Sequence, residues 1–386
     1  MKSFSIENFG PIDRVDIQCG DLTVFVGEQA MGKSITLEIV KLIEDAGYIH
    51  HRMETFGFDC SIPEKFFSHY FGMGKDKMWR EDTKIFVDKK PLFMKEIFER
   101  KKSREMKNFY IPAQRVLVID KGWPTPFQAF DSIYSFVTRE FSENIRSFMD
   151  MTFVEDGGKI FPQTNRLRQE LRESIDKTIF HGQTVHLSSS FQNRKMLLLK
   201  VADGTELPIT TWSTGQREFI PLLFGIYYCL PPAKSTKKDK IKSIIIEEPE
   251  MGLHPSAIVS VMLLVMELLN RGYKLFLSTH SQAVLDIVWV LREIKKRNAD
   301  IRYFYELFGL KKTPYTMELA ESIKKKTMRV NYFKPSEEGI VSLDISSLDP
   351  GSEYEEIWGW GGLSSFSGKA AEIVGAIAKD KMISGK

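Results

Sequence analysis

The sequence has few cysteines and no pattern typical of a disulfide or zinc framework. Of its 386 residues only three are cysteine, Cys19, Cys60 and Cys229, and no two of them form a C-x-x-C pair. An odd number of widely spaced thiols is typical of proteins that fold in a reducing compartment, and a structural zinc site needs clustered ligands. We therefore predict a cytoplasmic protein with neither feature.

Long apolar runs and a strong net charge are also missing. The longest apolar stretches, residues 219–230 and 258–269, are shorter than the roughly 20 residues of a membrane-spanning helix, and Pro221 and Glu267 interrupt them. The formal net charge is only +3, and acidic residues are interleaved with basic clusters such as Arg100–Arg104. Surfaces that bind nucleic acids are usually far more basic. We predict no membrane partner, and DNA binding has only weak support.

The sequence does contain four motifs associated with phosphate chemistry, in a fixed order. They are GEQAMGKS at 27–34, STGQRE at 213–218, IIIEEPE at 244–250 and STHS at 278–281. The first fits G-x-x-x-x-G-K-[ST] and lies between an apolar run, residues 22–26, and a helical pattern that begins at Ile35. A strand, a loop and a helix in this order are the context in which the motif binds phosphates.

Each residue type in this loop has a definite expected role. Gly27 and Gly32 allow backbone N–H groups to turn inward and form an anion nest at the positive end of a helix. Lys33 would reach the β- and γ-phosphates of a nucleotide, and Ser34 would ligate Mg²⁺. The predicted cofactors are therefore ATP and Mg²⁺. The residues predicted to bind the nucleotide here are Gly27, Glu28, Gln29, Ala30, Met31, Gly32, Lys33, Ser34 and Ile35.

Two carboxylates at the end of an apolar strand form a second candidate site element. Residues 244–246 are three isoleucines, typical of a strand buried on both faces, and Glu247 and Glu248 follow directly. We predict that Glu247 holds the metal and that Glu248 positions or deprotonates the attacking water. A strand end with a structural salt bridge is the alternative. His254 is interpreted first as a structural residue at the start of the next helix.

The order of these motifs resembles the ABC-type ATPase superfamily. Within it, EEPEMGLHP at 247–255, STHS and the pattern F-x-x-x-N-F-G-P-I from Phe4 to Ile12 resemble the RecF, SMC and OLD branch. Stand-alone AAA15-type ATPases of bacterial anti-phage systems such as PARIS and Septu are more similar still. The resemblance spans residues 1–47 and 109–290. It implies an α/β fold in which an ABC-type P-loop core contains a mixed sheet.

The resemblance also implies a site shared between subunits. In such ATPases the serine and glycine of the signature motif close over the γ-phosphate of ATP held by another subunit. Here the signature residues are Ser213, Thr214, Gly215 and Gln216. The expected assembly is a homodimer or higher homo-oligomer with ATP at the interface.

Two more site residues follow from the resemblance. Gln114, in YIPAQR, matches the glutamine that senses metal and water, although a plain surface residue is the alternative. His280 matches the switch histidine that contacts the γ-phosphate. The sequence departs from the family at Gln29, Ala30 and Met31, where relatives usually carry Asn-Gly and a small residue. It departs again at Glu247, where aspartate is usual. The extra methylene shifts the metal site, which predicts slow hydrolysis.

The chain is predicted to be an ATPase core divided by insertions. The core is expected over residues 1–49, 109–124 and 183–298, with a β-rich insertion over 50–108, a helical insertion over 125–182 and a C-terminal extension over 299–386. The helical insertion is far too short for an SMC coiled-coil arm. The extension has no recognisable Toprim nuclease motif, so the chain should not cut DNA itself, and its end is predicted to form an amphipathic helix.

Three function classes fit these observations. The first is an ATP-binding, slowly hydrolysing sensor or scaffold that controls a separate effector protein in prokaryotic anti-phage defence. The AAA15 resemblance and the missing nuclease motif favour it. The second is a RecF-like ATPase clamp in DNA repair or recombination, for which DNA binding should depend steeply on salt. The third, a nucleotide-binding subunit of a membrane transporter, is disfavoured by the large insertions and by the EEPE-x-x-LHP pattern.

Overall fold

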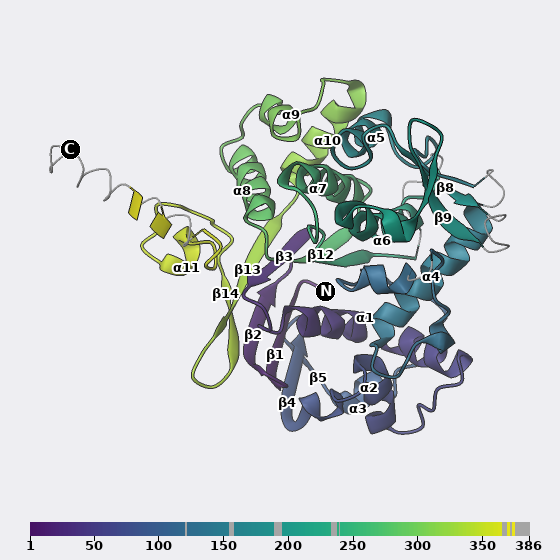
Figure 1. Cartoon of the computed structure of the whole chain (residues 1–386). Coiled ribbons are helices and arrows are strands. Elements are labelled where there is room, and N and C mark those ends of the chain that lie inside the picture. Colours follow the sequence, from purple (N-terminus) through teal and green to yellow (C-terminus); the bar gives the residue numbers. More distant parts are fainter. Residues whose placement is uncertain are drawn as a thin grey trace.

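A computed structural model describes residues 1–119, 122–153, 158–188, 195–232, 238, 240–364, 369–370 and 373–374. These residues form a mixed ten-stranded sheet in the order β5-β4-β1-β2-β14-β13-β3-β12-β11-β6, and an antiparallel four-stranded sheet. Helices cover both faces of the large sheet (Figure 1). The predicted α/β class with a mixed sheet is confirmed.

A block of parallel strands forms the part of the large sheet that positions the site. These strands are β13 (Met328–Pro335), β3 (Leu22–Gly27), β12 (Lys274–Thr279), β11 (Ser243–Glu247) and β6 (Asn108–Ile111). Residues 22–27 are buried throughout, as expected of a strand covered on both faces. Because parallel strands end at the same edge, the phosphate loop, Glu248, His280 and Gln114 all follow strands at that edge.

The other half of the large sheet is mostly antiparallel. It contains β1 (Ser3–Phe9), β2 (Ile12–Gln18), β4 (Trp79–Val87), β5 (Lys90–Leu92) and β14 (Ile340–Asp344). β1 pairs antiparallel with both β2 and β4, whereas β14 pairs parallel with β2. The N-terminal hairpin β1–β2 therefore pairs on one side with β4, from residues 50–108, and on the other side with β14, from the C-terminal region.

Residues 50–108 differ from the β-rich insertion that the sequence suggested. Besides β4 and β5 they contain α2 (Pro63–Phe71), α3 (Met94–Phe98) and the 3₁₀ turn η1 (Asp76–Met78). The aromatic run in α2 is helical because Phe66, Phe67, Tyr70 and Phe71 have helical spacing and are all buried. Both strands belong to the large sheet rather than to a separate lobe.

The helices form two layers around the large sheet (Figure 1). On one side α1 (Lys33–Thr55) packs against β3, β6 and β12. On the other side lie α7 (Pro255–Asn270) and α8 (Gln282–Lys296), on which α9 (Arg302–Phe308) and α10 (Pro314–Lys325) pack. His254 is the N-cap of α7, where its Nδ1 accepts from the backbone N–H of Ser256 at 3.3 Å, as a structural role requires. Next to edge strand β6, α4 (Phe136–Thr152) meets α6 (Thr214–Cys229).

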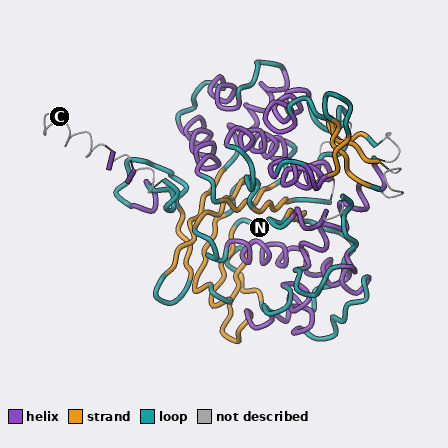
Figure 2. The backbone as a smooth tube through the Cα atoms, viewed as in Figure 1, coloured by secondary structure: helices purple, strands orange, loops and turns teal. Residues whose placement is uncertain are grey.

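The four-stranded sheet lies beside this core (Figure 2). Its order is β10 (Glu206–Pro208), β9 (Met196–Lys200), β8 (Thr184–Ser188) and β7 (Lys159–Phe161). The interval predicted as a helical insertion contains α4, α5 (Gln169–Ile175) and the π-helical turn η4 (Asp176–Phe180), but also β7. Short 3₁₀ turns η2 (Arg115–Ile119), η3 (Phe127–Ala129) and η6 (Ile209–Thr211) complete this region.

The C-terminal region is not simply appended to the core. β13 lies directly beside β3, and β14 follows it by an antiparallel pairing. After them comes α11 (Glu355–Trp358), and Trp360 packs on Trp289 of α8 with ring centroids 5.5 Å apart. The predicted terminal amphipathic helix lies largely outside the described residues. No helix within the described ranges is long and apolar enough to cross a membrane.

Candidate functional site

The phosphate loop connects β3 to α1 and requires glycine at both ends. Gly27 has φ 150°, and a Cβ there would lie 2.4 Å from the carbonyl oxygen of Phe333 in β13. Gly32 has φ 68°, and a Cβ there would lie 3.3 Å from Cγ1 of Ile12. A side chain at Gly27 would collide with backbone, so the neighbouring strand requires this glycine whether or not the loop binds a phosphate.

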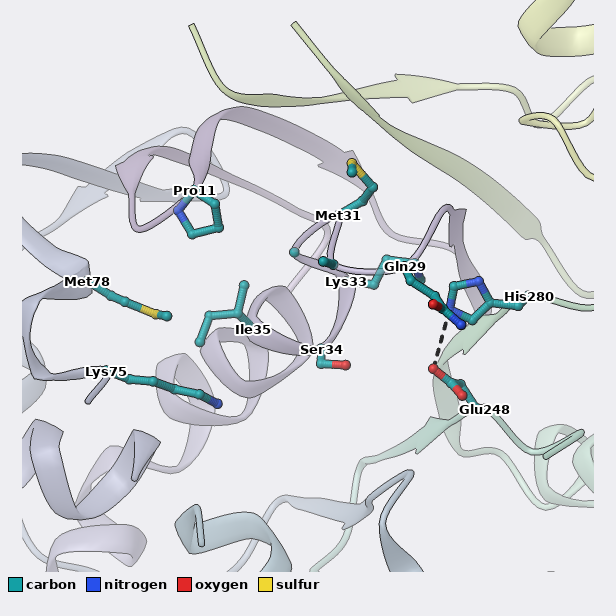
Figure 3. Close-up of a pocket in the computed structure, with 12 residues that line it drawn as sticks. Pro11, Gln29, Met31, Lys33, Ser34, Ile35, Lys75, Met78, Glu248 and His280 are labelled. Atoms are coloured by element: carbon teal, nitrogen blue, oxygen red, sulfur yellow. Dashed lines mark ion pairs between the residues drawn. The ribbon is translucent and has the colours of Figure 1, made fainter. Parts of the chain in front are cut away.

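The loop opens into a cavity of about 440 Å³ at the edge where the parallel strands end. The structure brings together residues from three of the four motifs here, although these motifs lie far apart in the sequence (Figure 3). The lining residues are Pro11, Gln29, Ala30, Met31, Gly32, Lys33, Ser34, Ile35, Lys75, Met78, Glu248 and His280.

Lys75 and Met78 in this lining were missed by sequence reasoning. Both come from the segment around η1, which no motif marks. Figure 3 shows them on one side of the start of α1, with Glu248 and His280 on the other. Lys75 Nζ lies 3.8 Å from Oε2 of Glu38. A second cation therefore stands near the phosphate loop.

Lys33 is buried, and its ammonium is held by the loop itself. Its Nζ donates to the carbonyl oxygens of Gly27 at 2.9 Å and Glu28 at 2.6 Å. Burial lowers the pKa of Lys33 to about 8, although nearby carboxylates, Glu248 first among them, favour the charged form. A phosphate at the loop would supply the counter-charge that a buried ammonium needs.

Ser34 and Glu247 fit a magnesium site. Glu247 is buried, and its Oε2 accepts from the backbone N–H of Ala113 at 2.9 Å, while its Oε1 has no hydrogen-bond partner in the described structure. Burial raises the pKa of Glu247, and the nearby Ser34 hydroxyl and the N–H of Ala113 oppose this shift. A divalent cation would satisfy the unpaired oxygen. The described residues hold no group of three or more His, Cys, Asp or Glu side chains placed so that they could hold a metal ion by themselves. Mg²⁺ commonly binds through one or two protein ligands together with phosphates and waters.

Gln114 lies near Ser34 and Glu247, the two candidate magnesium ligands. It is exposed, and it lines a second cavity of about 480 Å³ together with Ser34 and Glu247. Because Ser34 lines both cavities, the two adjoin at the start of α1. This position is compatible with the proposed role in sensing metal and water.

Glu248 and His280 lie next to each other on one side of the phosphate-loop cavity. Oε1 of Glu248 is 3.4 Å from Nε2 of His280 (Figure 3). Burial, and then the charge of Lys33, lower the pKa of His280, while Glu248 opposes this shift. Glu250 holds the following loop, because its Oε1 accepts from Thr279 Oγ1 and from the backbone N–H of His280, both at 2.7 Å.

The backbone of Glu248 is in the left-handed region, with φ 41°. This conformation is uncommon for a residue with a side chain and tends to occur at functional sites. The backbone N–H of Glu248 donates to the carbonyl oxygen of Ser278 at 3.0 Å. The turn directs the Glu248 carboxylate into the phosphate-loop cavity. Glu247, one residue earlier, does not line this cavity.

The signature motif lies away from this cavity. Ser213 is the N-cap of α6, and Ser213 and Thr214 are exposed, with Gly215 half-buried. None of the signature residues is among those that line the chain's own phosphate-loop cavity. Gln216 is turned inward, since its amide donates to Ile179 O at 3.2 Å and to Gln183 Oε1 at 2.8 Å. It is thus not presented to a nucleotide in this conformation.

Comparison with protein families gives one match. Residues 124–286 match the family described as "AAA domain, putative AbiEii toxin, Type IV TA system". No curated protein matches the sequence. The matched region covers less than half of the chain; it includes the signature motif, both acidic residues and His280, but not the phosphate loop.

Several solved structures are similar over most of the chain, with low identity. One is an Smc head bound to the C-winged helix domain of ScpA, with 11% identity, coverage of 89% of this chain and 96% of that chain, and a TM-score of 0.42. The SMC head domain from Thermotoga maritima has 10% identity, 89% and 98% coverage, and a TM-score of 0.36. A dimeric post-hydrolysis ATP-binding cassette bound to ADP and Pi has 11% identity, 72% and 88% coverage, and a TM-score of 0.30.

Proposed function

We propose that the protein is an ATPase that binds and slowly hydrolyses ATP. The observation that carries this proposal is the cavity that Lys33, Ser34, Glu248 and His280 line together. A lysine in a phosphate loop, a hydroxyl beside a buried carboxylate, and an acid next to a histidine are the groups that phosphoryl transfer to water requires.

Each residue has a separate task in this scheme. Lys33 binds the β- and γ-phosphates. Ser34 and Glu247 would hold Mg²⁺, which would neutralise charge on the phosphates. Glu248 accepts a proton from the attacking water as its oxygen bonds to the γ-phosphorus. The bond to the bridging oxygen breaks, and ADP and phosphate leave. His280 contacts the γ-phosphate, and Gln114 orients water on the metal side.

We further propose that the active species is a symmetric assembly of at least two chains. Ser213 and Gly215 are accessible but do not line the chain's own phosphate-loop cavity, so a partner chain can use them. In an isologous dimer the same two surfaces meet twice and form two sites at once. ATP then favours the closed dimer because it binds that state better than the open one.

Mixing two inactive variants tests this arrangement. Lys33→Ala removes the phosphate ligand of one chain, and Ser213→Arg blocks the signature of the other. A mixed dimer has one site with both defects and one site with neither. ATPase activity should partly return on mixing. Co-assembly without any recovered activity would contradict a shared site.

The biological role that we propose is a sensor or scaffold that controls a separate effector protein in anti-phage defence. The family description names a toxin and a type IV toxin–antitoxin system, and the sequence has no recognisable nuclease motif. Slow turnover, expected from glutamate at position 247, suits a switch. Co-expression with the product of the neighbouring gene should protect cells against phage, and Glu248→Gln should change that protection.

The RecF-like alternative is tested with the same protein. Duplex DNA should then stimulate ATP turnover, and binding should weaken steeply with salt because released counterions drive it. If DNA leaves ATP turnover unchanged and protection against phage depends on the effector, the defence role is supported over the repair clamp.

A further inference from the structure

One buried arginine beside the site has no role in the scheme above. Arg115 follows Gln114 at the start of η2, and it is fully buried. Its guanidinium donates to four backbone carbonyl oxygens, those of Glu247 at 3.0 Å, Glu248 at 3.1 Å, Glu218 at 3.1 Å and Pro112 at 3.5 Å.

These acceptors belong to three separate segments of the site. Pro112 is in the loop after β6 that carries Gln114, and Glu247 and Glu248 are at the end of β11. Glu218 is in the first turns of α6, five residues after the signature serine. In the described part of the chain no carboxylate forms a salt bridge with Arg115. A buried guanidinium is usually paired with an acid, so its use on main-chain carbonyls alone is unusual.

The planar fork of arginine explains how one side chain can hold two neighbouring carbonyls. Nη1 bonds the carbonyl of Glu247 while Nη2 bonds that of Glu248. The peptide of Glu248 is thereby held from one side by Arg115 and from the other by Ser278. The φ of Glu248, 41°, is unfavourable for a residue other than glycine. Lysine carries its three N–H donors on one nitrogen and therefore cannot reproduce the planar fork.

We propose that Arg115 is a positioning residue that holds Glu248 in its water-activating conformation and couples that conformation to the signature helix α6. The inference rests on the proposed ATPase function and adds a coupling residue to it. Nε of Arg115 bonds α6, and the opposite end of the same rigid group bonds the backbone of Glu248. A shift of α6, when a partner's ATP engages Ser213, moves the guanidinium and with it the base.

The test separates binding from turnover in Arg115→Lys and Arg115→Met. Arg115 does not line the phosphate-loop cavity. The Kd of both variants for a non-hydrolysable ATP analogue should therefore stay within about threefold of the wild type. Turnover should fall by about tenfold or more, because Glu248 is no longer held in the unfavourable conformation. A residue that only stabilises the fold would not produce this split between Kd and kcat.

Arg139 provides a matched control. It is also buried, its Nε donates to Tyr134 O at 2.9 Å, and its guanidinium lies over the ring of Phe58 at 5.1 Å; Arg139 itself lines neither cavity and does not contact the backbone of Glu247 or Glu248. Arg139→Met should lower the unfolding temperature while kcat stays near the wild-type value. If Arg115→Met does not fold, Arg115→Lys, which keeps the charge, decides the question.

Coupling to α6 is measured by a double-mutant cycle with Ser213→Ala. If Arg115 transmits engagement of the signature, Ser213→Ala should lower kcat clearly less in the Arg115→Lys background than in the wild type. If the losses of kcat caused by the two substitutions are additive in free energy, the proposed coupling is overturned. A kcat of both Arg115 variants within twofold of the wild type, or an equal loss in Arg139→Met, overturns the positioning role. A wild-type chain without ATP turnover overturns the proposed function instead.

Discussion

Replacing Glu248 by glutamine separates ATP binding from hydrolysis. The substitution removes the proton acceptor and keeps the size of the side chain. Glu248 lines the cavity with Lys33, and its Oε1 is 3.4 Å from Nε2 of His280. Its negative charge also faces the space where the phosphates would lie. The amide should therefore leave ATP affinity unchanged or increase it.

The expected loss of turnover follows from the role of a general base. Such a base contributes roughly 10²–10⁴-fold to the rate, which corresponds to about 3–5 kcal/mol in the activation free energy. We therefore expect Glu248→Gln to lower kcat by at least about 100-fold. Single-turnover hydrolysis of labelled ATP, measured beside equilibrium binding, reports both quantities.

Glu250→Gln is the matched control, because it makes the same change two residues away. Oε1 of Glu250 accepts both hydrogen bonds, from Thr279 and from the N–H of His280, and a glutamine oxygen can accept them as well. Turnover of this variant should stay within about threefold of the wild type. Wild-type turnover in Glu248→Gln, together with a large loss in Glu247→Gln, would mean that the roles of the two acids are reversed.

Four further predictions address the loop, the metal and the stability of the fold. Lys33→Ala should abolish binding of labelled ATP, since the backbone nest cannot replace the point charge, and unchanged affinity would refute the phosphate-loop assignment. Glu247→Gln should shift the Mg²⁺ dependence of turnover to higher concentrations, and an unchanged titration would exclude it as a ligand. Gly27→Ala should destabilise the fold by about 2–4 kcal/mol, because the new Cβ would lie 2.4 Å from the carbonyl oxygen of Phe333; urea unfolding measures this. Burial raises the pKa of Glu38 from 4.5 to about 7, so the folded state binds more protons between these values, and stability should fall by about 3 kcal/mol as pH rises through this window. Glu38→Gln should remove that slope in urea unfolding at pH 5 and pH 8, and a persistent slope would assign it to other groups.

Much of the site could be predicted from the sequence because its signals are local. A glycine-rich loop between a strand and a helix is encoded within a dozen residues, and so is a pair of acids after three isoleucines. The carboxyl ends of parallel strands lie at one edge of a sheet, so motifs that follow such strands, as those of Lys33, Glu248 and His280 do, predict side chains that lie close together. The α/β class with a mixed sheet was implied by the resemblance that these motifs carry, and the strand order confirms it.

Only the tertiary structure decided which strands are neighbours and which distant residues enter the site. An apolar pattern indicates that a strand is buried but does not identify its partner, because pairing joins residues far apart in the chain. For this reason the sequence did not indicate that β13 lies beside β3, or that β4 and β5 extend the large sheet. The same holds for Lys75, which no motif marks, and for Arg115, whose carbonyl partners come from three segments. Their positions depend on packing between segments, which no local pattern of residues records.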